Sequence, residues 1–369
     1  MLNISRKRTK SSIDLDIIYS IMAICRNVEL GFVEEREEFL LKSCFFPSKV
    51  GGKPAWLLLK PILSPEQLSC KLCGETTIFL TQVYTPRDDK HSAYHRTIFL
   101  FVCRNPACCR KNENKNLRVF RSQLPRNNDF YSSDSPVKDK VDDEPTAEKY
   151  QPVCIVCGAW GTKRCARCQN VSYCSKGHQV IDWKIQHKKS CVMQEAAESM
   201  PVADHGVLFP HYELVTEAEE YEEIKEKSEE EKMKDLSAFL KSDEAKDIND
   251  LPVSELEKMA VSENDKVFLK FKERVAHEPD QVLRYQLGGD PLWVSGEHIP
   301  KEEDIPKCSC GSKRIFEFQV MPQLLIHLDV DSLGDSIDWG TLCVFTCADS
   351  CDIGNNYHEE FVYKQDFSE

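Results

Sequence analysis

Long apolar runs are missing from this sequence, and so is a leader for export. No uninterrupted apolar stretch approaches the roughly 20 residues that a membrane-spanning helix needs. Residues 13–25 are largely apolar but include Asp14 and Asp16, charges that the apolar core of a signal peptide would not carry. We therefore expect an intracellular protein with no membrane partner.

The motifs of the common enzyme classes are missing as well. Gly51-Gly52-Lys53 is followed by Pro54, which lacks the backbone donor and the hydroxyl group that a phosphate-binding loop needs. The sequence has no Gly-x-Ser-x-Gly, Gly-x-Gly-x-x-Gly or His-Glu-x-x-His string. We therefore expect no catalytic residues and no enzymatic activity.

The negative charge of the chain is concentrated in one segment, where basic residues are few. The formal net charge of the 369 residues is −13, which argues against a general nucleic-acid binder. Residues 213–265 hold 19 acidic and 7 basic residues, a net charge of −12, so the rest of the chain is almost neutral. Few apolar residues interrupt this acidic segment, and its composition predicts a partly helical or disordered stretch.

Changes in composition divide the chain into six parts. They are a disordered extension (1–27), a β-rich N-terminal half (28–131), a linker (132–150), a cysteine and histidine block (151–193), an acidic linker (194–265) and a β-rich C-terminal half (266–369). Strand-like runs are 76–84, 96–103 and 116–121, and a docked helix is expected within 266–285, with Val267, Phe268, Phe271 and Val275 on one face. Either Met1 or Met22 could be the true start of the protein.

The two β-rich halves repeat one another. A shift of 237 residues aligns 51–83 with 288–320 without a gap, and twelve of the 33 positions are identical, where chance gives roughly two. The match resumes with 101–103 against 345–347. We therefore predict an α+β, mainly β fold in which the two halves form one pseudo-duplicated body, with the middle block and the acidic segment inserted between them.

Cysteine is abundant, and the 18 cysteines often stand in close pairs. The middle block holds four pairs of soft metal ligands: Cys154/Cys157, Cys165/Cys168, Cys174/His178 and His187/Cys191. Tetrahedral zinc takes four such ligands, so eight ligands suit two ions. A segment this short has almost no apolar core, so bound zinc must supply most of its folding energy.

The order of these residues resembles a MYND zinc finger. The matching strings are Cys154-x-x-Cys157, Cys165-x-x-Cys168, Tyr173-Cys174-Ser175-Lys176-Gly177-His178, Asp182-Trp183 and His187-Lys188-x-x-Cys191. The resemblance implies interleaved sites, with one ion on Cys154, Cys157, Cys174 and His178 and the other on Cys165, Cys168, His187 and Cys191. Most MYND fingers have cysteine where His178 stands, and histidine is an equally good zinc ligand. Proline-containing peptides or transcriptional regulators are the expected partners of such a finger.

Further strings resemble the programmed cell death protein 2 family over 28–130 and 150–369. They include Phe46-Pro47-Ser48-Lys49-Val50-Gly51-Gly52, Phe318-Gln319-Val320-Met321-Pro322-Gln323 and Ser336-Ile337-Asp338-Trp339-Gly340. This resemblance implies a non-enzymatic protein of the cytoplasm and nucleus that chaperones a newly made small-subunit ribosomal protein during ribosome biogenesis. The alternative is a nuclear regulator of proliferation and apoptosis that acts through protein or DNA binding by its finger.

The repeat indicates one more zinc site in each half. Cys70, Cys73, Cys103 and Cys108 (or Cys109) would form one site, and Cys308, Cys310, Cys347 and Cys351 the other. In each set a pair near a turn is matched by a pair at a strand end, as in a zinc ribbon. The alternative is a group of buried free thiols, since cysteine is also a good core residue.

The acidic segment suits a basic client. Ribosomal proteins are strongly basic, and a tethered negative segment could cover their charge and speed their capture. The alternative is that residues 213–265 form a solvated linker only. Residues 150–193 hold seven Lys or Arg and one acidic residue, but we do not expect nucleic acid as a partner.

Overall fold

The computed structural model describes residues 28–134, 144–191, 203–220, 263–330 and 336–368. The extension 1–27 and most of the acidic linker lie outside these residues, so their predicted disorder stays a prediction. Within the described parts, no helix is long and apolar enough to cross a membrane.

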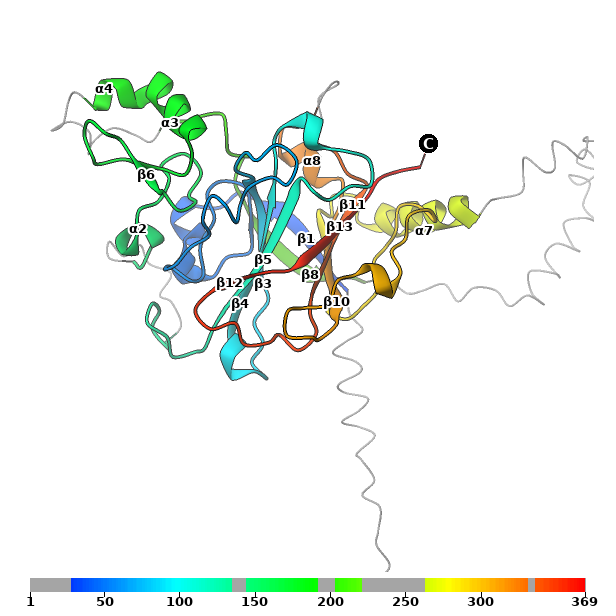
Figure 1. The fold of residues 1–369 in the computed structure, drawn as a ribbon. Coiled ribbons are helices and arrows are strands. Elements are labelled where there is room, and N and C mark those ends of the chain that lie inside the picture. Colours follow the sequence, from blue (N-terminus) through cyan, green and yellow to red (C-terminus); the bar gives the residue numbers. More distant parts are fainter. Residues whose placement is uncertain (1–27, 135–143, 192–202, 221–262, 331–335, 369) are drawn as a thin grey trace, which may run out of the picture.

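One antiparallel sheet of eleven strands forms the body (Figure 1). Its strands are β1 (Glu29–Glu34), β2 (Lys49–Val50), β3 (Ile78–Tyr84), β4 (His95–Val102), β5 (Leu117–Leu124), β8 (Tyr212–Ala218), β9 (Leu283–Tyr285), β10 (Arg314–Val320), β11 (Thr341–Cys347), β12 (Tyr357–Glu359) and β13 (Phe361–Gln365). Their order is β12-β5-β4-β3-β2-β8-β1-β9-β10-β11-β13. The consecutive strands β12 and β13 pair with β5 and β11, so one segment of chain joins the two ends of the sheet and nearly closes it.

The duplication is visible in the hairpins of the two halves. The β3–β4 ladder has a bulge between Phe79 and Thr81, and the β10–β11 ladder has one between Phe316 and Phe318, 237 residues later. Gln82 accepts a hydrogen bond from the backbone of Ala55 at 2.9 Å, and its counterpart Gln319 accepts one from Leu292 at 2.6 Å. The prediction of a mainly β, duplicated body is therefore confirmed.

The first strands of the two halves are exchanged. Strand β1 precedes the N-terminal hairpins in the chain but pairs with β9 of the C-terminal half, whereas β8 pairs with β2 of the N-terminal half. The two exchanged strands also pair with each other. Residues 212–218 were assigned to the acidic linker from composition, and this assignment is wrong because they form a central strand.

The described helices lie around the sheet, and apart from the 15-residue α7 they are short. Outside the finger they are η1 (Glu38–Leu41), η2 (Ser43–Phe45), η3 (His91–Ala93), η4 (Pro106–Cys108), α2 (Ala147–Tyr150), α7 (Glu263–His277), η8 (Glu302–Asp304) and α8 (Leu324–His327). The helix expected within 266–285 stops at His277, and Leu283–Tyr285 is strand β9 instead. Phe271 and Val275 of α7 are buried as predicted, but Phe268 is 39 % exposed at the rim of this face.

Candidate metal centres

The finger is built from short elements around cysteine and histidine side chains. They are β6 (Lys163–Arg164), β7 (Ser172–Tyr173), α3 (Lys176–Asp182), the π-helix η5 (Trp183–His187) and α4 (Lys188–Ser190). The Ser175 hydroxyl accepts a hydrogen bond from the backbone N–H of His178 and caps α3. Tyr173 donates a hydrogen bond to the buried carboxylate of Asp182 at 2.7 Å, which ties β7 to α3. These contacts hold the ligand-bearing segments in a fixed arrangement.

The structure groups the eight side chains of the finger in the interleaved order that the resemblance implied. One group is Cys154, Cys157, Cys174 and His178, and the other is Cys165, Cys168, His187 and Cys191. Within each group the ligand atoms lie within 4.8 Å of one another. The Sγ atoms of Cys157 and Cys174 are 3.5 Å apart, and those of Cys165 and Cys191 are 3.9 Å apart.

These spacings fit tetrahedral zinc. Bonds of about 2.3 Å to a tetrahedral ion place two sulfur atoms about 3.8 Å apart. The histidines also present a nitrogen to their groups: Nδ1 of His178 lies 3.6 Å from Sγ of Cys154, and Nε2 of His187 lies 3.6 Å from Sγ of Cys168. The finger thus offers two complete sets of four soft ligands.

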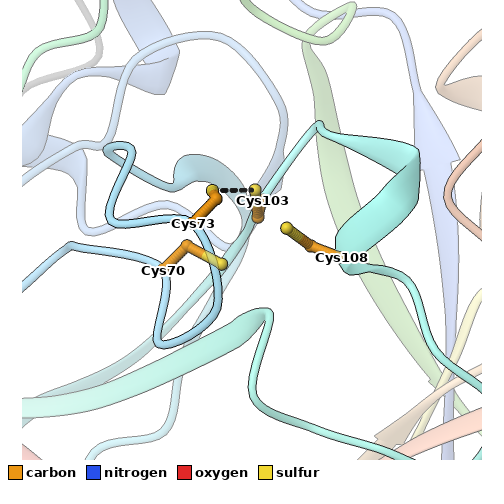
Figure 2. Close-up of side chains that lie close together, drawn as sticks. All are labelled: Cys70, Cys73, Cys103 and Cys108. Carbon is orange, nitrogen blue, oxygen red and sulfur yellow. Dashed lines mark hydrogen bonds between the residues drawn. The ribbon is translucent and has the colours of Figure 1, made fainter.

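A third group of ligands lies in the N-terminal half of the body, where Figure 2 shows four cysteine side chains that converge. These are Cys70, Cys73, Cys103 and Cys108. The Sγ atoms of Cys73 and Cys103 are 3.6 Å apart. Cys109 points elsewhere, because its Sγ lies 3.2 Å from the backbone N–H of Asp338. Of the two alternatives left open by the sequence, the structure places Cys108 in the group.

The fourth group lies at the matching place in the C-terminal half. It consists of Cys308, Cys310, Cys347 and Cys351, with 3.7 Å between the Sγ atoms of Cys308 and Cys351 and 3.6 Å between those of Cys310 and Cys347. The backbone N–H of Ser312 lowers the pKa of Cys310 to about 7. The thiolate is the form that binds metal, so this hydrogen bond favours coordination.

Two residues outside the cysteine motifs contact this fourth group. Arg121 of β5 places its guanidinium 3.4 Å from Sγ of Cys351, and Nε2 of His358 in β12 lies 3.4 Å from Sγ of Cys308. Such donors stabilise negative charge on thiolate ligands and orient them. Sequence spacing held no signal for either residue, because strand pairing alone brings them to the cysteines.

The finger docks on the N-terminal half of the body and lies at one end of the molecule in Figure 1. The indole N–H of Trp56 donates to the carbonyl oxygen of Gly158 at 2.8 Å, and the backbone N–H of Trp160 donates to the carbonyl oxygen of Leu63 at 3.1 Å. Gly158 has a φ of +79°, and a Cβ there would lie 3.1 Å from atoms of Lys53 and Pro54. The finger is therefore held in one orientation instead of hanging on a free tether.

Comparison with known proteins agrees with this organisation. The chain matches the N-terminal domain of programmed cell death protein 2 over residues 27–138, the MYND finger over 154–191 and the C-terminal domain of programmed cell death protein 2 over 265–366. No solved structure matches the chain significantly.

Curated relatives cover nearly the whole chain. Programmed cell death protein 2 of Rattus norvegicus is 49 % identical over 348 residues, which are 93 % of this chain and 97 % of the relative. Programmed cell death protein 2-like of Homo sapiens is 28 % identical over 82 % of this chain and 85 % of its own length. "Probable 20S rRNA accumulation protein 4" of Schizosaccharomyces pombe is 24 % identical over 78 % of this chain and 84 % of its own length. The chain therefore belongs to the programmed cell death protein 2 family.

Proposed function

We propose that the chain is a non-enzymatic chaperone of a newly made small-subunit ribosomal protein, active in the cytoplasm and nucleus. The observation that supports this most is the similarity to the fission yeast protein, whose name refers to the accumulation of an rRNA. MYND fingers mediate protein–protein interaction, so a finger fixed on a rigid β body is suited to hold a protein client. The finger and the cysteine groups together would carry four zinc ions.

Charge supports a basic client. The segment between β8 and α7, residues 221–262, contains 13 acidic and 7 basic residues, a net charge of −6. Its two ends are anchored at neighbouring parts of the body by β8 and α7, through the ion pairs of Glu219 with Arg274 and Arg284. A negative segment anchored in this way raises the local concentration of a basic polypeptide at the body.

The test is recovery of the client by the full-length, zinc-loaded chain from cells, followed by mass spectrometry. Stoichiometric recovery of one small-subunit ribosomal protein is expected. The purified client should then stay soluble at low ionic strength only when the chain is present. Recovery of chromatin complexes without a ribosomal protein would favour the alternative, a nuclear regulator of proliferation and apoptosis.

The role of the acidic segment is tested separately. Replacing residues 221–262 by an uncharged segment of equal length keeps β8 and α7, whereas deleting 213–265 would remove a central strand. We expect slower client association with a weaker salt dependence and an almost unchanged dissociation rate, because exposed charges act over about 8–10 Å at physiological salt. An unchanged association rate and salt dependence would show that this segment is a linker only.

A further inference from the structure

A cavity of about 960 Å³ opens where the N-terminal half, the finger and the chain before β8 meet. Trp56 and Leu41 of the body, Phe209 before β8 and Leu328 after α8 give it apolar walls, and Gly158 of the finger contributes backbone. Four parts of the chain that are far apart in sequence thus line one space, whose volume suits a group of a few amino-acid residues.

Lys49 of β2 is buried in the wall of this cavity, with only 5 % of its surface exposed. Its ammonium donates one hydrogen bond, to the carbonyl oxygen of Lys53 at 2.9 Å. Across the β2–β8 ladder it faces Glu213, but the carboxylate of Glu213 pairs with Arg36 at 3.3 Å. Within the described part of the chain, no carboxylate lies within ion-pair distance of Lys49. A buried ammonium without an anionic partner is costly.

The C-terminal half has a buried cationic side chain, Arg284, at the position equivalent to Lys49. Lys49 lies opposite Gln82 in the β2–β3 ladder, and Arg284 lies opposite the equivalent Gln319 in the β9–β10 ladder. Arg284 is buried as well, but Glu219 neutralises it with a carboxylate oxygen at 2.9 Å. One half therefore supplies a carboxylate to its buried cation, and the other half leaves its cation facing a cavity.

We propose that this cavity binds a carboxylate-bearing peptide group, whose carboxylate pairs with Lys49 while its apolar part contacts Trp56 and Phe209. The carboxylate could come from the C-terminus of a peptide or from an aspartate or glutamate side chain. Both sources present the same oxygen pair to the ammonium, so the experiment below separates them. A ligand of this cavity need not be the client proposed above, and neither result decides the other.

Ligand affinity at this site should depend on pH, because the charge of Lys49 does. Burial, opposed in part by the exposed Glu38, lowers the pKa of Lys49 to about 8. The other charged or titratable side chains of the described residues that line the cavity are Lys42, Lys53, Arg104, Glu148, Asp204, His211 and Asp329. A carboxylate binds the protonated amine, so binding takes up a proton at alkaline pH. Affinity should fall about tenfold between pH 8 and pH 9.5, a range in which carboxylates stay ionised.

The test uses the full-length, zinc-loaded protein and titration calorimetry with three N-acetylated probes. They are Gly-Gly-Leu with a free C-terminal carboxylate, the same peptide with a C-terminal amide, and the amide peptide with glutamate in place of leucine. The free acid or the glutamate peptide should bind at least tenfold more tightly than the neutral amide, and the tighter of the two identifies the source. The substitution Lys49→Met should abolish this difference, and Lys60→Met, at an exposed lysine, should not.

Binding of both charged peptides no tighter than that of the neutral amide, or unchanged binding by the Lys49→Met variant, would overturn the proposal. So would tighter binding of inorganic phosphate than of either charged peptide. If the variant does not fold, acylation of the wild-type amines at pH 8 can be followed by site-resolved mass spectrometry. The charged peptide that binds more tightly should slow acylation of Lys49 at least severalfold and leave the acylation of Lys60 unaffected. Equal acylation rates of Lys49 with and without this peptide would contradict the proposed site.

Discussion

At the scale of residues, the buried ion pair of Arg96 and Glu317 connects the two halves. Arg96 of β4 and Glu317 of β10 are fully buried on strands that are not neighbours, and a guanidinium nitrogen lies 2.8 Å from a carboxylate oxygen. Burial opposes ionisation of Glu317, but Arg96 outweighs it and keeps the pKa of Glu317 below its usual value. The equivalent position in the N-terminal hairpin is Leu80, so the hairpin itself does not require the charge.

Breaking this pair from one side should destabilise the whole body. We expect Glu317→Leu to lower the free energy of unfolding by about 3–5 kcal/mol, because it leaves the buried guanidinium of Arg96 without its carboxylate partner. The double variant Arg96→Met/Glu317→Leu should recover most of this loss. Chemical denaturation of the zinc-loaded protein measures both, and a single variant as stable as the wild type would contradict the role of the pair.

His95 should make stability depend on pH. Its ring stacks on Phe46 with centroids 4.2 Å apart and shares a hydrogen bond of 2.9 Å with the Tyr84 hydroxyl. Burial, reinforced by Arg126, lowers the pKa of His95 to about 4, against about 6.5 in an unfolded chain. The stability from neutral His95 is therefore present above pH 6.5 and is lost as the pH falls towards 4.

The check is a comparison of the wild type with His95→Gln by denaturation at several pH values. Between pH 7 and pH 5.5 the wild type should lose about 1 kcal/mol more than the variant, since one pKa unit corresponds to about 1.4 kcal/mol. Acid effects on the metal ligands are common to both proteins and cancel in the difference. Parallel pH profiles would show that His95 titrates normally.

At the scale of elements, each half carries the same unit, a bulged hairpin with a cysteine pair before it and another at the end of its second strand. The Cys70-x-x-Cys73 pair is one residue longer than Cys308-x-Cys310, yet both pairs approach the cysteine at the end of the second strand of the hairpin, Cys103 or Cys347. A turn residue with positive φ follows each pair, Gly74 at +76° and Gly311 at +91°. Glycine at this turn directs the chain back into the hairpin.

Zinc content should distinguish two adjacent cysteines. Cys108→Ser removes a member of the N-terminal group, and we expect it to reduce the content from four zinc ions per chain to three. Cys109→Ser is the matched control and should retain all four, because the Sγ of Cys109 contacts the backbone of Asp338. Native mass spectrometry of the full-length proteins counts the ions. The reverse pattern would assign Cys109 as the ligand.

At the scale of the whole molecule, neither half is a self-sufficient domain. Exchange of β1 and β8 places a strand of each half in the other, and the final segment, β12 and β13, bonds to both β5 and β11. The apolar core is likewise continuous from Val156 in the finger through Trp56 to Trp339 in the C-terminal half. The apolar side chains of each part are therefore buried only when the other parts are present.

Fragment complementation should expose this dependence. Residues 266–369 alone should be poorly soluble and lack cooperative unfolding, because they carry an open sheet edge on β9. Co-expression of 28–130 with 203–369 should give a soluble complex, whereas 28–130 with 266–369 should do so poorly because β8 is missing. Size-exclusion chromatography and thermal unfolding report both results. Cooperative unfolding of 266–369 alone would contradict the single-body fold.

The sequence by itself determined the features that depend on short-range spacing. Pairs such as Cys154 and Cys157 lie close in any compact arrangement of a tight turn, so their pattern indicated the finger before any fold was known. The repeat of 51–83 at 288–320 indicated the duplicated hairpins in the same direct way. Closely spaced metal ligands and internal repeats can be recognised from the sequence without a structure.

Only the tertiary structure decided the features that depend on distant pairings. Composition assigned residues 212–218 to a linker because Glu213 and Glu217 are acidic, but β1 and β2 supply hydrogen-bond partners on both sides and make them a strand. Pairing also separated Cys108 from Cys109, and it placed Lys49 in the wall of a cavity where no described carboxylate lies within ion-pair distance of its ammonium. Strand pairing between distant segments depends on the packing of the whole chain, and no short window of sequence encodes it.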